Sequence, residues 1–387
     1  MRIALFSWES LDAVAVGGVG VHVSELARAL ARRDHEVHLF TGTTRGDQEH
    51  YEHIEGVYVH RCGYDRHDDF LYEMWNMCRA FEHHFFTTRA LTGEFDVIHA
   101  HDWMTAEVMS LLKGQCPARR ILTIHSTEFG RAGNKIHGGP SEAVRHAEWQ
   151  GIYQAERVVC VSQALKHEVA WLYQAPDDKL CVIYNGVRPE LFDLDVDAGE
   201  VKVGLGIHPM APMFLFAGRI VYQKGVDLLV EAMPMLLRHV PTAMFVLAGD
   251  GEMRWDLEHK TRATMEHNTR WLGKVEPARL RAYFKACDAV VVPSRNEPFG
   301  IVILEAWSAR KPVVATKNGG PGEFVEHGVD GYSIYDHPDS IAWGLGQITA
   351  DWEKTRKMGK NGRRKVEQRF TWDRIAAQVE EVYRGTR

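Results

Sequence analysis

The chain has 387 residues, which is more than one compact core usually holds, so two domains are expected. Its apolar share of 45% and charged share of 25% are ordinary for a soluble globular protein. The net charge of −6, without a long basic tract, argues against a nucleic-acid ligand.

Signals for export and membrane insertion are weak. The apolar run in "MRIALFSWES" is too short for a signal-peptide core and ends at Glu9. No stretch approaches the roughly 20 apolar residues that span a bilayer. The six cysteines are scattered and form no C-x-x-C pair, so reduced thiols are expected. These features predict a cytoplasmic protein without a transmembrane segment, and peripheral contact with a membrane stays open.

Short apolar strands alternate with amphipathic helices along the first half. "RIALFSW" precedes a glycine loop and a helix-like segment in which Val23, Leu26, Ala27 and Leu30 recur at helical spacing. Further strand candidates are "EVHLFTG", "VYVHRC", "DVIHAH", "RILTIHS" and "RVVCVS". Apolar strands separated by helices predict an α/β fold with a parallel sheet covered on both faces.

The alternation stops and then restarts in the second half. "ELFDLDVDAGEVKVGLGIHPMAP" is acidic and rich in Gly and Pro, which predicts a linker. "MFLFAGRI", "AMFVLAGDG", "TRWLGKV", "AVVVPS" and "PVVATKNGG" then continue the strand pattern. We therefore expect two doubly wound, Rossmann-like domains, residues 1–193 and 198–370. Ligands of open α/β sheets bind beyond the carboxyl ends of the strands, so two such domains facing each other would share a cleft.

A glycine loop, "VGGVGVH" at 16–22, follows the first strand. Gly17, Gly18 and Gly20 would let backbone N–H groups approach a phosphate at a helix N-terminus. Val23 stands where a full G-x-G-x-x-G motif has its last glycine, and a tight turn without a ligand fits equally well. No acidic residue ends the second strand, which argues against NAD.

Two long cations follow a strand in "FAGRIVYQKG". Arg219 and Lys224 lie just past its carboxyl end, where they could grip a diphosphate. A solvated basic loop is an equally good interpretation of this segment alone.

Two glutamates flank an apolar run in "NEPFGIVILEAW". Glu297 is expected in the loop before a helix, and Glu305 lies eight residues later within it. A Glu at a helix N-terminus and an unrelated surface Glu are the structural alternative. However, Glu305 belongs to a run that should be buried, and a buried unpaired carboxylate is costly. This favours a ligand with hydroxyl groups.

Together these motifs resemble the retaining glycosyltransferases of family 4. The C-terminal half shows G-R-x-x-x-x-K-G, E-P-F-G with a second Glu, and "GGPGE", which resemble the donor half of these two-domain GT-B enzymes. In the N-terminal half, "HAHDW", "TIHS" and "VIYNGV" match the same group, which is related to bacterial and archaeal glycogen synthases. The end of the chain resembles the family's last helix, which would complete the N-terminal domain with residues of about 371–387.

The resemblance implies roles for the motif residues. Arg219 and Lys224 would hold the diphosphate of a nucleotide sugar and stabilise the leaving group without a metal. Glu297 would contact the donor sugar and Glu305 the ribose hydroxyls. The implied donor-binding residues are Gly18, Arg219, Lys224, Gly273, Val275, Glu297, Phe299, Gly300, Glu305, Gly319 and Gly320.

Two further residues of the N-terminal half match the family. His125 would lie beside the donor sugar, and Asp102 near the acceptor. A core histidine at a strand end is the structural alternative for His125. His99 and His101 alternate along a strand, but we expect them to pack rather than to bind a metal. No cofactor is expected.

The sequence thus predicts a transfer of a sugar, glucose being expected, from a nucleotide-diphosphate sugar such as UDP- or ADP-glucose to a carbohydrate acceptor. An α-glucan acceptor is favoured, and a lipid, inositol or small-molecule acceptor is the alternative. A nucleotide-sugar epimerase is less favoured. So is a glycoside hydrolase with Glu297 and Glu305 as its acid and base, because a hydrolase has no use for cations aimed at phosphates. A non-catalytic binding module is disfavoured because every motif residue is present.

Overall fold

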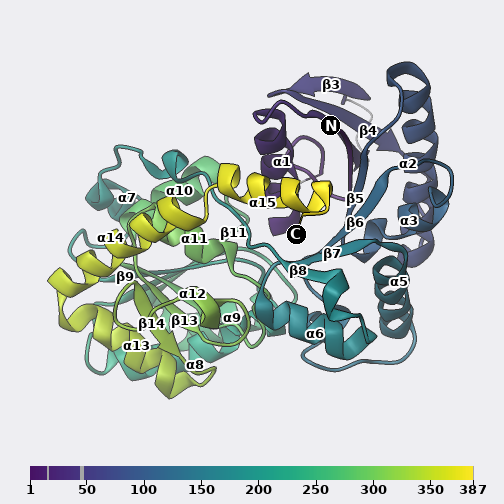
Figure 1. The fold of residues 1–387 in the computed structure, drawn as a ribbon. Coiled ribbons are helices and arrows are strands. Elements are labelled where there is room, and N and C mark those ends of the chain that lie inside the picture. The colour runs from purple at the N-terminus through teal and green to yellow at the C-terminus, as the bar shows by residue number, and fades with distance from the viewer. Residues whose placement is uncertain (15–16, 44–47, 387) are drawn as a thin grey trace. The chain divides into compact units, whose positions relative to one another are not determined.

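The computed structural model describes residues 1–14, 17–43 and 48–386. The chain divides into two compact units, Met1–Asn185 with Trp372–Arg387, and Gly186–Thr371. Each unit is a sheet of mainly parallel strands with helices on both faces (Figure 1). The predicted α/β class with two doubly wound domains is confirmed.

The sheet of the first unit has the strand order β3-β4-β2-β1-β5-β6-β7-β8. All neighbours are parallel except β3, which is antiparallel to β4. The strands are β1 (Arg2–Ser7), β2 (Glu36–Thr43), β3 (Tyr51–Ile54), β4 (Val57–Gly63), β5 (Val97–His101), β6 (Arg119–Ile124), β7 (Arg157–Cys160) and β8 (Leu180–Val182). The helices are α1 (Gly18–Ala31), α2 (Phe70–Thr92), α3 (Glu107–Leu111), α4 (Glu128–Arg131), α5 (Pro140–Gln154), α6 (Gln163–Tyr173) and α15 (Trp372–Arg384).

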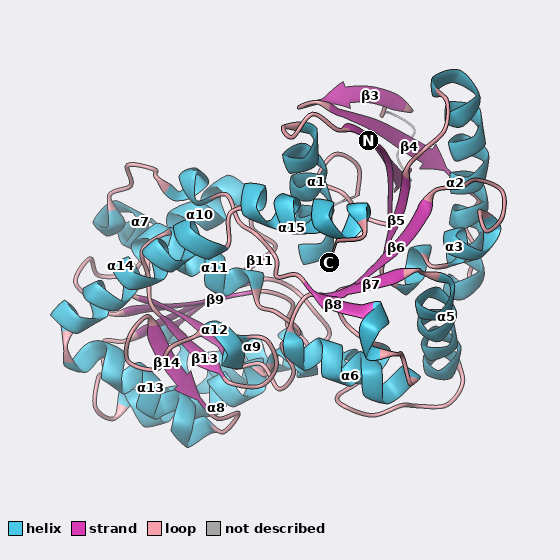
Figure 2. Ribbon diagram, in the orientation of Figure 1, coloured by secondary structure: helices cyan, strands magenta, loops and turns pink. Residues whose placement is uncertain are grey.

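Helices from both ends of the chain cover one face of this sheet. α1 and α15 pack against each other, and their apolar side chains share a core with β1, β2 and β4. Figure 2 shows them on one side of the strands and α2, α3 and α5 on the other. From α2, Phe81 and Phe85 are fully buried against Phe6, whereas Tyr72 and Trp75 are exposed. The aromatic side chains of α2 therefore belong to the core on one face of the helix only.

The sheet of the second unit has the order β11-β10-β9-β12-β13-β14 and is parallel throughout. Its strands are β9 (Met213–Ala217), β10 (Met244–Ala248), β11 (Thr269–Gly273), β12 (Ala289–Val292), β13 (Val313–Thr316) and β14 (Gly331–Ile334). Its helices are α7 (Ala198–Gly204), α8 (Val226–Leu237), α9 (Arg254–Met265), α10 (Pro277–Ala286), α11 (Ile301–Ser308), α12 (Pro321–Phe324), α13 (Pro338–Ala350) and α14 (Trp352–Arg369). Figure 2 shows α8 and α13 on one side of the sheet and α11 and α14 on the other.

Residues 186–193, placed by the sequence in the first domain, belong to the second unit. Val187 forms a parallel bridge with Thr371. The guanidinium of Arg363 donates to the carbonyl of Pro189 at 2.8 Å and pairs with Asp193 at 2.6 Å. These contacts carry the segment into the second unit, so the division falls after Asn185 rather than after 193.

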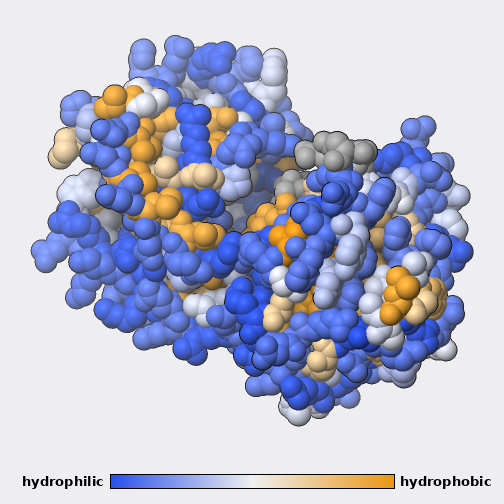
Figure 3. Space-filling model, turned by 90° about the horizontal axis from the view of Figure 1, so that it is seen from above, coloured by the Kyte–Doolittle hydropathy of each residue, from blue (hydrophilic) through white to orange (hydrophobic). Residues whose placement is uncertain are grey.

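Helix length and hydropathy bear on membrane insertion. Across the described residues, no helix is both long and apolar enough to cross a bilayer. Figure 3 shows a face on which most side chains are hydrophilic and the hydrophobic ones gather in a few patches.

Candidate functional site

The predicted donor-binding residues follow three adjacent strands of the second unit. Arg219 and Lys224 follow β9, Glu297 follows β12, and Gly319 follows β13. β12 is hydrogen-bonded to both β9 and β13, and all three strands are parallel. Their carboxyl ends therefore bring the three loops to one edge of the sheet, the edge at which α/β domains bind ligands.

A cation and a carboxylate meet at this edge. The ammonium of Lys224 lies 2.7 Å from Oε2 of Glu297, and the hydroxyl of Ser294 donates to the same oxygen at 2.9 Å. Glu297 is 5% exposed. The pair is thus largely shielded from water, where an electrostatic interaction is stronger than at an open surface.

Backbone contacts join the Glu297 loop to the glycine loop after β13. Glu297 and Gly319 form a parallel bridge, and the N–H of Gly320 donates to the carbonyl of Glu297 at 2.9 Å. Gly319 has φ +85°, and a Cβ there would lie 2.1 Å from the Glu297 carbonyl oxygen. Only glycine fits this position, so the "GGPG" segment holds Glu297 in place through the main chain.

Arg295 links the Lys224 turn to the Glu297 loop, and the sequence analysis missed it. Its guanidinium lies 3.9 Å from the ring centroid of Tyr222, donates to the carbonyl of Tyr222 at 2.9 Å, and pairs with both oxygens of Asp227 at 2.8 and 2.7 Å. Its backbone N–H donates to Gln223 at 2.9 Å, and its carbonyl accepts from Asn318 at 3.2 Å. The only signal in the sequence was a long cation beside the motif, with nothing to identify its partners.

The other two charged residues of the donor motif are more open. Arg219 is exposed, and its Nη2 donates to Gln223 Oε1 at 3.2 Å. Glu305 is partly buried on α11, and no group in the described parts of the chain hydrogen-bonds its carboxylate. Desolvation raises the pKa of Glu305 to about 7, although the charge of Arg281 opposes this shift. The sequence analysis expected Glu305 to be buried. Its side chain is partly exposed, which leaves the carboxylate open to a ligand.

The remaining donor-motif residues shape the backbone. Gly273, at the end of β11, has φ +67° and accepts from the N–H of Gly249 at 2.8 Å. Val275 is partly buried. Gly300 has φ +93° and caps α11. Phe299 is 2% exposed and packs against Phe324, so its side chain belongs to the core and only its main chain can face a ligand.

Asp102 and His125 lie together in the first unit. The carboxylate of Asp102 accepts the backbone N–H of His125 at 2.7 Å. Burial raises the pKa of Asp102 to about 6, against the effect of Arg131, and burial lowers the pKa of His125 to about 3. His125 is therefore a neutral imidazole. His99 bonds Tyr383 and Thr123, each at 2.7 Å, and packs in the core as expected.

A buried network holds the segment after His125. Arg131 pairs with Glu148 at 2.7 Å and donates to the carbonyl of Ser126 at 3.0 Å. The hydroxyl of Tyr173 also donates to Glu148, and the N–H of Glu128 donates to it at 2.8 Å. Burial raises the pKa of Glu148 to about 7. The segment just after His125 is thus held by residues of two helices, α5 and α6.

The glycine loop of the first unit already contacts a carboxylate. Gly17 caps α1, and its N–H donates to Oε2 of Glu9 at 2.6 Å. Gly18 is exposed as the first residue of α1, and Val16, the start of the expected loop, lies outside the described residues. Glu9 therefore accepts from the helix end at which a phosphate and a tight turn without a ligand were equally good interpretations.

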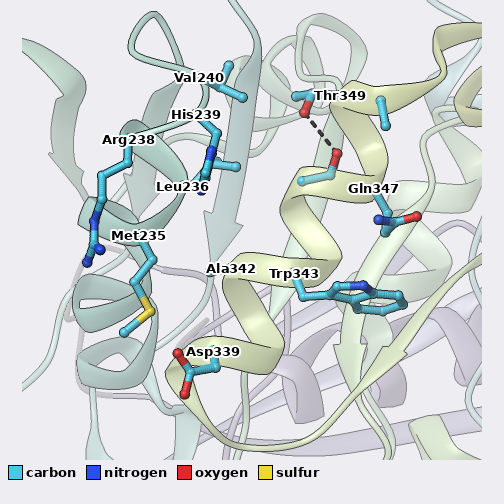
Figure 4. A pocket seen from close by; sticks show the side chains of 12 residues that line it. Met235, Leu236, Arg238, His239, Val240, Asp339, Ala342, Trp343, Gln347 and Thr349 are labelled. Carbon is cyan, nitrogen blue, oxygen red and sulfur yellow. Dashed lines mark hydrogen bonds between the residues drawn. The ribbon is translucent and has the colours of Figure 1, made fainter.

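A surface hollow of about 520 Å³ lies between the end of α8 and α13 (Figure 4). Its lining includes Met235, Arg238, Asp339 and Trp343. None of the motif residues lines it, and it has no convergent set of charged groups. We do not assign it to the functional site.

Both halves of the chain match models of known protein families. Residues 16–191 match the model described as Glycosyltransferase Family 4, and residues 199–365 match the model described as Glycosyl transferases group 1. The two matches cover the two structural units in turn.

Similar proteins align over nearly the whole chain. An uncharacterized glycosyltransferase of Methanocaldococcus jannaschii is 38% identical over 390 residues, which cover 99% of this chain and 98% of the relative. A glycogen synthase of Mycobacterium tuberculosis is 28% identical over 400 residues, which cover 99% of this chain and 94% of the relative. Among solved structures, sucrose-phosphate synthase from Thermosynechococcus elongatus has a TM-score of 0.84 and 25% identity, covering 100% of this chain and 98% of its own.

Proposed function

We propose that this chain, which belongs to the family 4 glycosyltransferases of GT-B fold, transfers a sugar from a nucleotide-diphosphate sugar to an acceptor hydroxyl with retention of the anomeric configuration. The observation that carries this proposal is the pair of Lys224 and Glu297 beside Arg219, at the carboxyl ends of adjacent parallel strands. Loss of a diphosphate from a sugar develops negative charge on the leaving group and positive charge on the ring. A cation in contact with a carboxylate can stabilise both charges: the cation stabilises the leaving group, and the carboxylate stabilises the ring.

The two cations would act on the diphosphate. Lys224 and Arg219 follow β9, and within the described ranges the guanidinium of Arg219 has one side-chain hydrogen bond, at 3.2 Å to Gln223. Fixed positive groups that face a developing charge lower the barrier without reorganising during the reaction. In this proposal Lys224 neutralises the leaving diphosphate and Arg219 binds it in a bidentate manner.

Glu297 would act on the sugar. Its carboxylate accepts from Lys224 and Ser294. A carboxylate beside a cation suits the stabilisation of an oxocarbenium-like ring next to a leaving diphosphate, whereas a hydrolase has no use for a cation aimed at phosphates. This argues against the hydrolase hypothesis.

Glu305 and the predicted residues of the first unit have roles of their own in this proposal. The partly buried carboxylate of Glu305 has open acceptor sites for the ribose hydroxyls. His125, a neutral imidazole, would bond the donor sugar, and Asp102 would serve the acceptor side. Gly18, Gly273, Val275, Gly300, Gly319 and Gly320 would offer main-chain groups to the donor. Because an epimerase would need many of the same contacts, the test must measure transfer of the sugar to an acceptor.

For the substrates we propose UDP- or ADP-glucose as donor and an α-glucan as acceptor. The relatives named glycogen synthase and sucrose-phosphate synthase support a glucosyl donor, but their names imply different acceptors. A lipid, inositol or small-molecule acceptor is therefore the alternative.

The test measures release of nucleotide diphosphate from UDP-, ADP- and GDP-glucose, with and without maltooligosaccharide, followed by analysis of the sugar product. Acceptor-dependent release with an α-linked product is expected, and Glu297→Gln serves as the inactive control. Absence of release and of any thermal shift with all three donors would overturn the proposal. Free epimerised nucleotide sugar without transfer would establish the epimerase instead.

A further inference from the structure

Three histidines from three elements of the first unit face one another. They are His22 on α1, His101 at the end of β5, and His125 just after β6. One ring nitrogen of each lies within 4.8 Å of those of the other two. His101 Nδ1 lies 3.2 Å from His125 Nε2, and the ring centroids of His22 and His125 are 4.5 Å apart.

The cluster is closed off from solvent and incompletely satisfied. The exposed fractions are 4% for His22, 1% for His101 and 9% for His125. Nε2 of His22 and Nε2 of His101 are both buried without a hydrogen-bond partner among the described residues. Buried polar atoms are nearly always paired, and an unpaired one is costly. Two such atoms in one cluster indicate a missing ligand.

The hydrogen bond of His22 fixes which of its nitrogens is available. Its Nδ1 lies 2.7 Å from Oδ1 of Asn185. An amide oxygen only accepts, so Nδ1 carries the proton and Nε2 presents a lone pair. A second-shell carbonyl oxygen that orients an imidazole in this way is typical of histidines that bind metals.

The chemistry of the three groups narrows the class of ligand. His22, His101 and His125 offer three imidazole nitrogens to an ion and no oxygen ligand. Neutral imidazoles are ligands of first-row transition metals, whereas Mg²⁺ and Ca²⁺ prefer oxygen. With Zn–N bonds of about 2.0–2.1 Å in tetrahedral geometry, the ligating nitrogens lie about 3.4 Å apart. The nitrogens of the cluster lie within 4.8 Å of one another, so the three rings would have to draw closer around an ion.

We propose that His22, His101 and His125 form a binding site for a divalent first-row transition metal of the Zn²⁺ type. Asp102, next to His101 in the chain, supplies a buried carboxylate that balances the added charge. All three ligands belong to the first unit, and the proposed transfer reaction needs no ion there. Because His125 is also assigned to the donor sugar, an ion held here would compete with donor binding and inhibit transfer.

The sequence analysis expected no metal at His99 and His101. His99 is indeed committed to Tyr383 and Thr123. The ligand set instead includes His22, which lies on a helix distant in sequence from the strand pair. Because the three histidines come from separate elements, no short sequence motif contains all of them.

The experiment uses the full chain after removal of metals with a chelator. Co²⁺ and Zn²⁺ are titrated by calorimetry, and the Co²⁺ complex is also followed by its visible d–d absorption. We expect one saturable ion per chain with an absorption band of histidine-bound Co²⁺. His22→Ala should weaken the affinity at least tenfold and abolish the band. His259→Ala removes an exposed histidine of α9 and should bind as the unmodified protein does.

His22 is buried, so circular dichroism and thermal melting must show that the variant is folded. If His22→Ala does not fold, His22→Gln keeps a polar side chain of similar reach and is measured instead. Absence of saturable binding by the unmodified protein, or binding by the folded variant equal to it, would overturn the metal site. These measurements do not involve turnover, so their failure is distinguishable from failure of the proposed transfer reaction.

Discussion

The ammonium of Lys224 lies 2.7 Å from Oε2 of the Glu297 carboxylate. The sequence analysis assigned these residues to different parts of a donor, the diphosphate and the sugar. Their contact means that each charge compensates the other. A diphosphate would then give Lys224 a second anionic partner and leave Glu297 free to face the ring.

This relationship predicts coupled effects on turnover. Glu297→Gln should lower kcat by about 100-fold or more, the scale of losing one preorganised electrostatic group. Lys224→Ala should have a comparable effect, since it also leaves a buried carboxylate unpaired. Because the two act as a unit, the double variant should lose much less than the product of the single losses. Independent, multiplicative losses measured by steady-state kinetics would contradict the coupling.

Arg295 is predicted to position the site without touching the donor. Arg295→Ala removes the Asp227 pair and the contact with Tyr222, so the Lys224 turn and the Glu297 loop should loosen. We expect kcat to fall and KM to rise together, with a loss of stability of about 1–2 kcal/mol.

Matched variants separate this role from simple loss of charge. Arg295→Lys keeps the charge but not the bidentate geometry, so it should rescue stability only in part. Arg262→Ala removes an exposed pair with Glu258 and should change stability by less than about 0.5 kcal/mol. Unchanged kinetics in a folded Arg295→Ala protein would argue against a positioning role.

Gly319→Ala should disrupt the glycine loop after β13. Its Cβ would lie 2.1 Å from the Glu297 carbonyl oxygen, and the backbone there has φ +85°. The two loops must separate to relieve this clash, so we expect loss of nucleotide-sugar binding together with a lower melting temperature. Gly346→Ala is the control, because it lies in α13 with open space around its Cβ and should stabilise by about 0.5–1 kcal/mol. A Gly319→Ala protein with normal affinity for the nucleotide sugar would contradict the view that only glycine fits beside the Glu297 carbonyl.

The sequence predicted most of the sheets because parallel strands are buried on both faces and read as apolar runs. It also placed the charged motif residues correctly after β9 and β12, since their loops follow directly from those runs. Arg295 was missed because its partners, Tyr222 and Asp227, lie in another loop and meet it only through strand pairing. The domain boundary shifted for a similar reason: the partner of Val187 is Thr371, almost at the other end of the chain.

The pH dependence of donor binding should report Glu305. Desolvation raises its pKa from the ordinary 4.5 to about 7, so the free protein holds a proton on this carboxyl group at pH 6 and loses it by pH 8. Ribose hydroxyls donate best to the ionised form. UDP affinity should therefore increase as the pH rises from 6 to 8, by up to about tenfold, which corresponds to one pKa unit of coupling. UDP has its own titrating phosphate, so Glu305→Gln, which keeps an amide oxygen but cannot ionise, is the control. The difference in slope between the two proteins, measured by calorimetry at each pH, isolates the carboxylate. Equal slopes would show that Glu305 does not face the ribose.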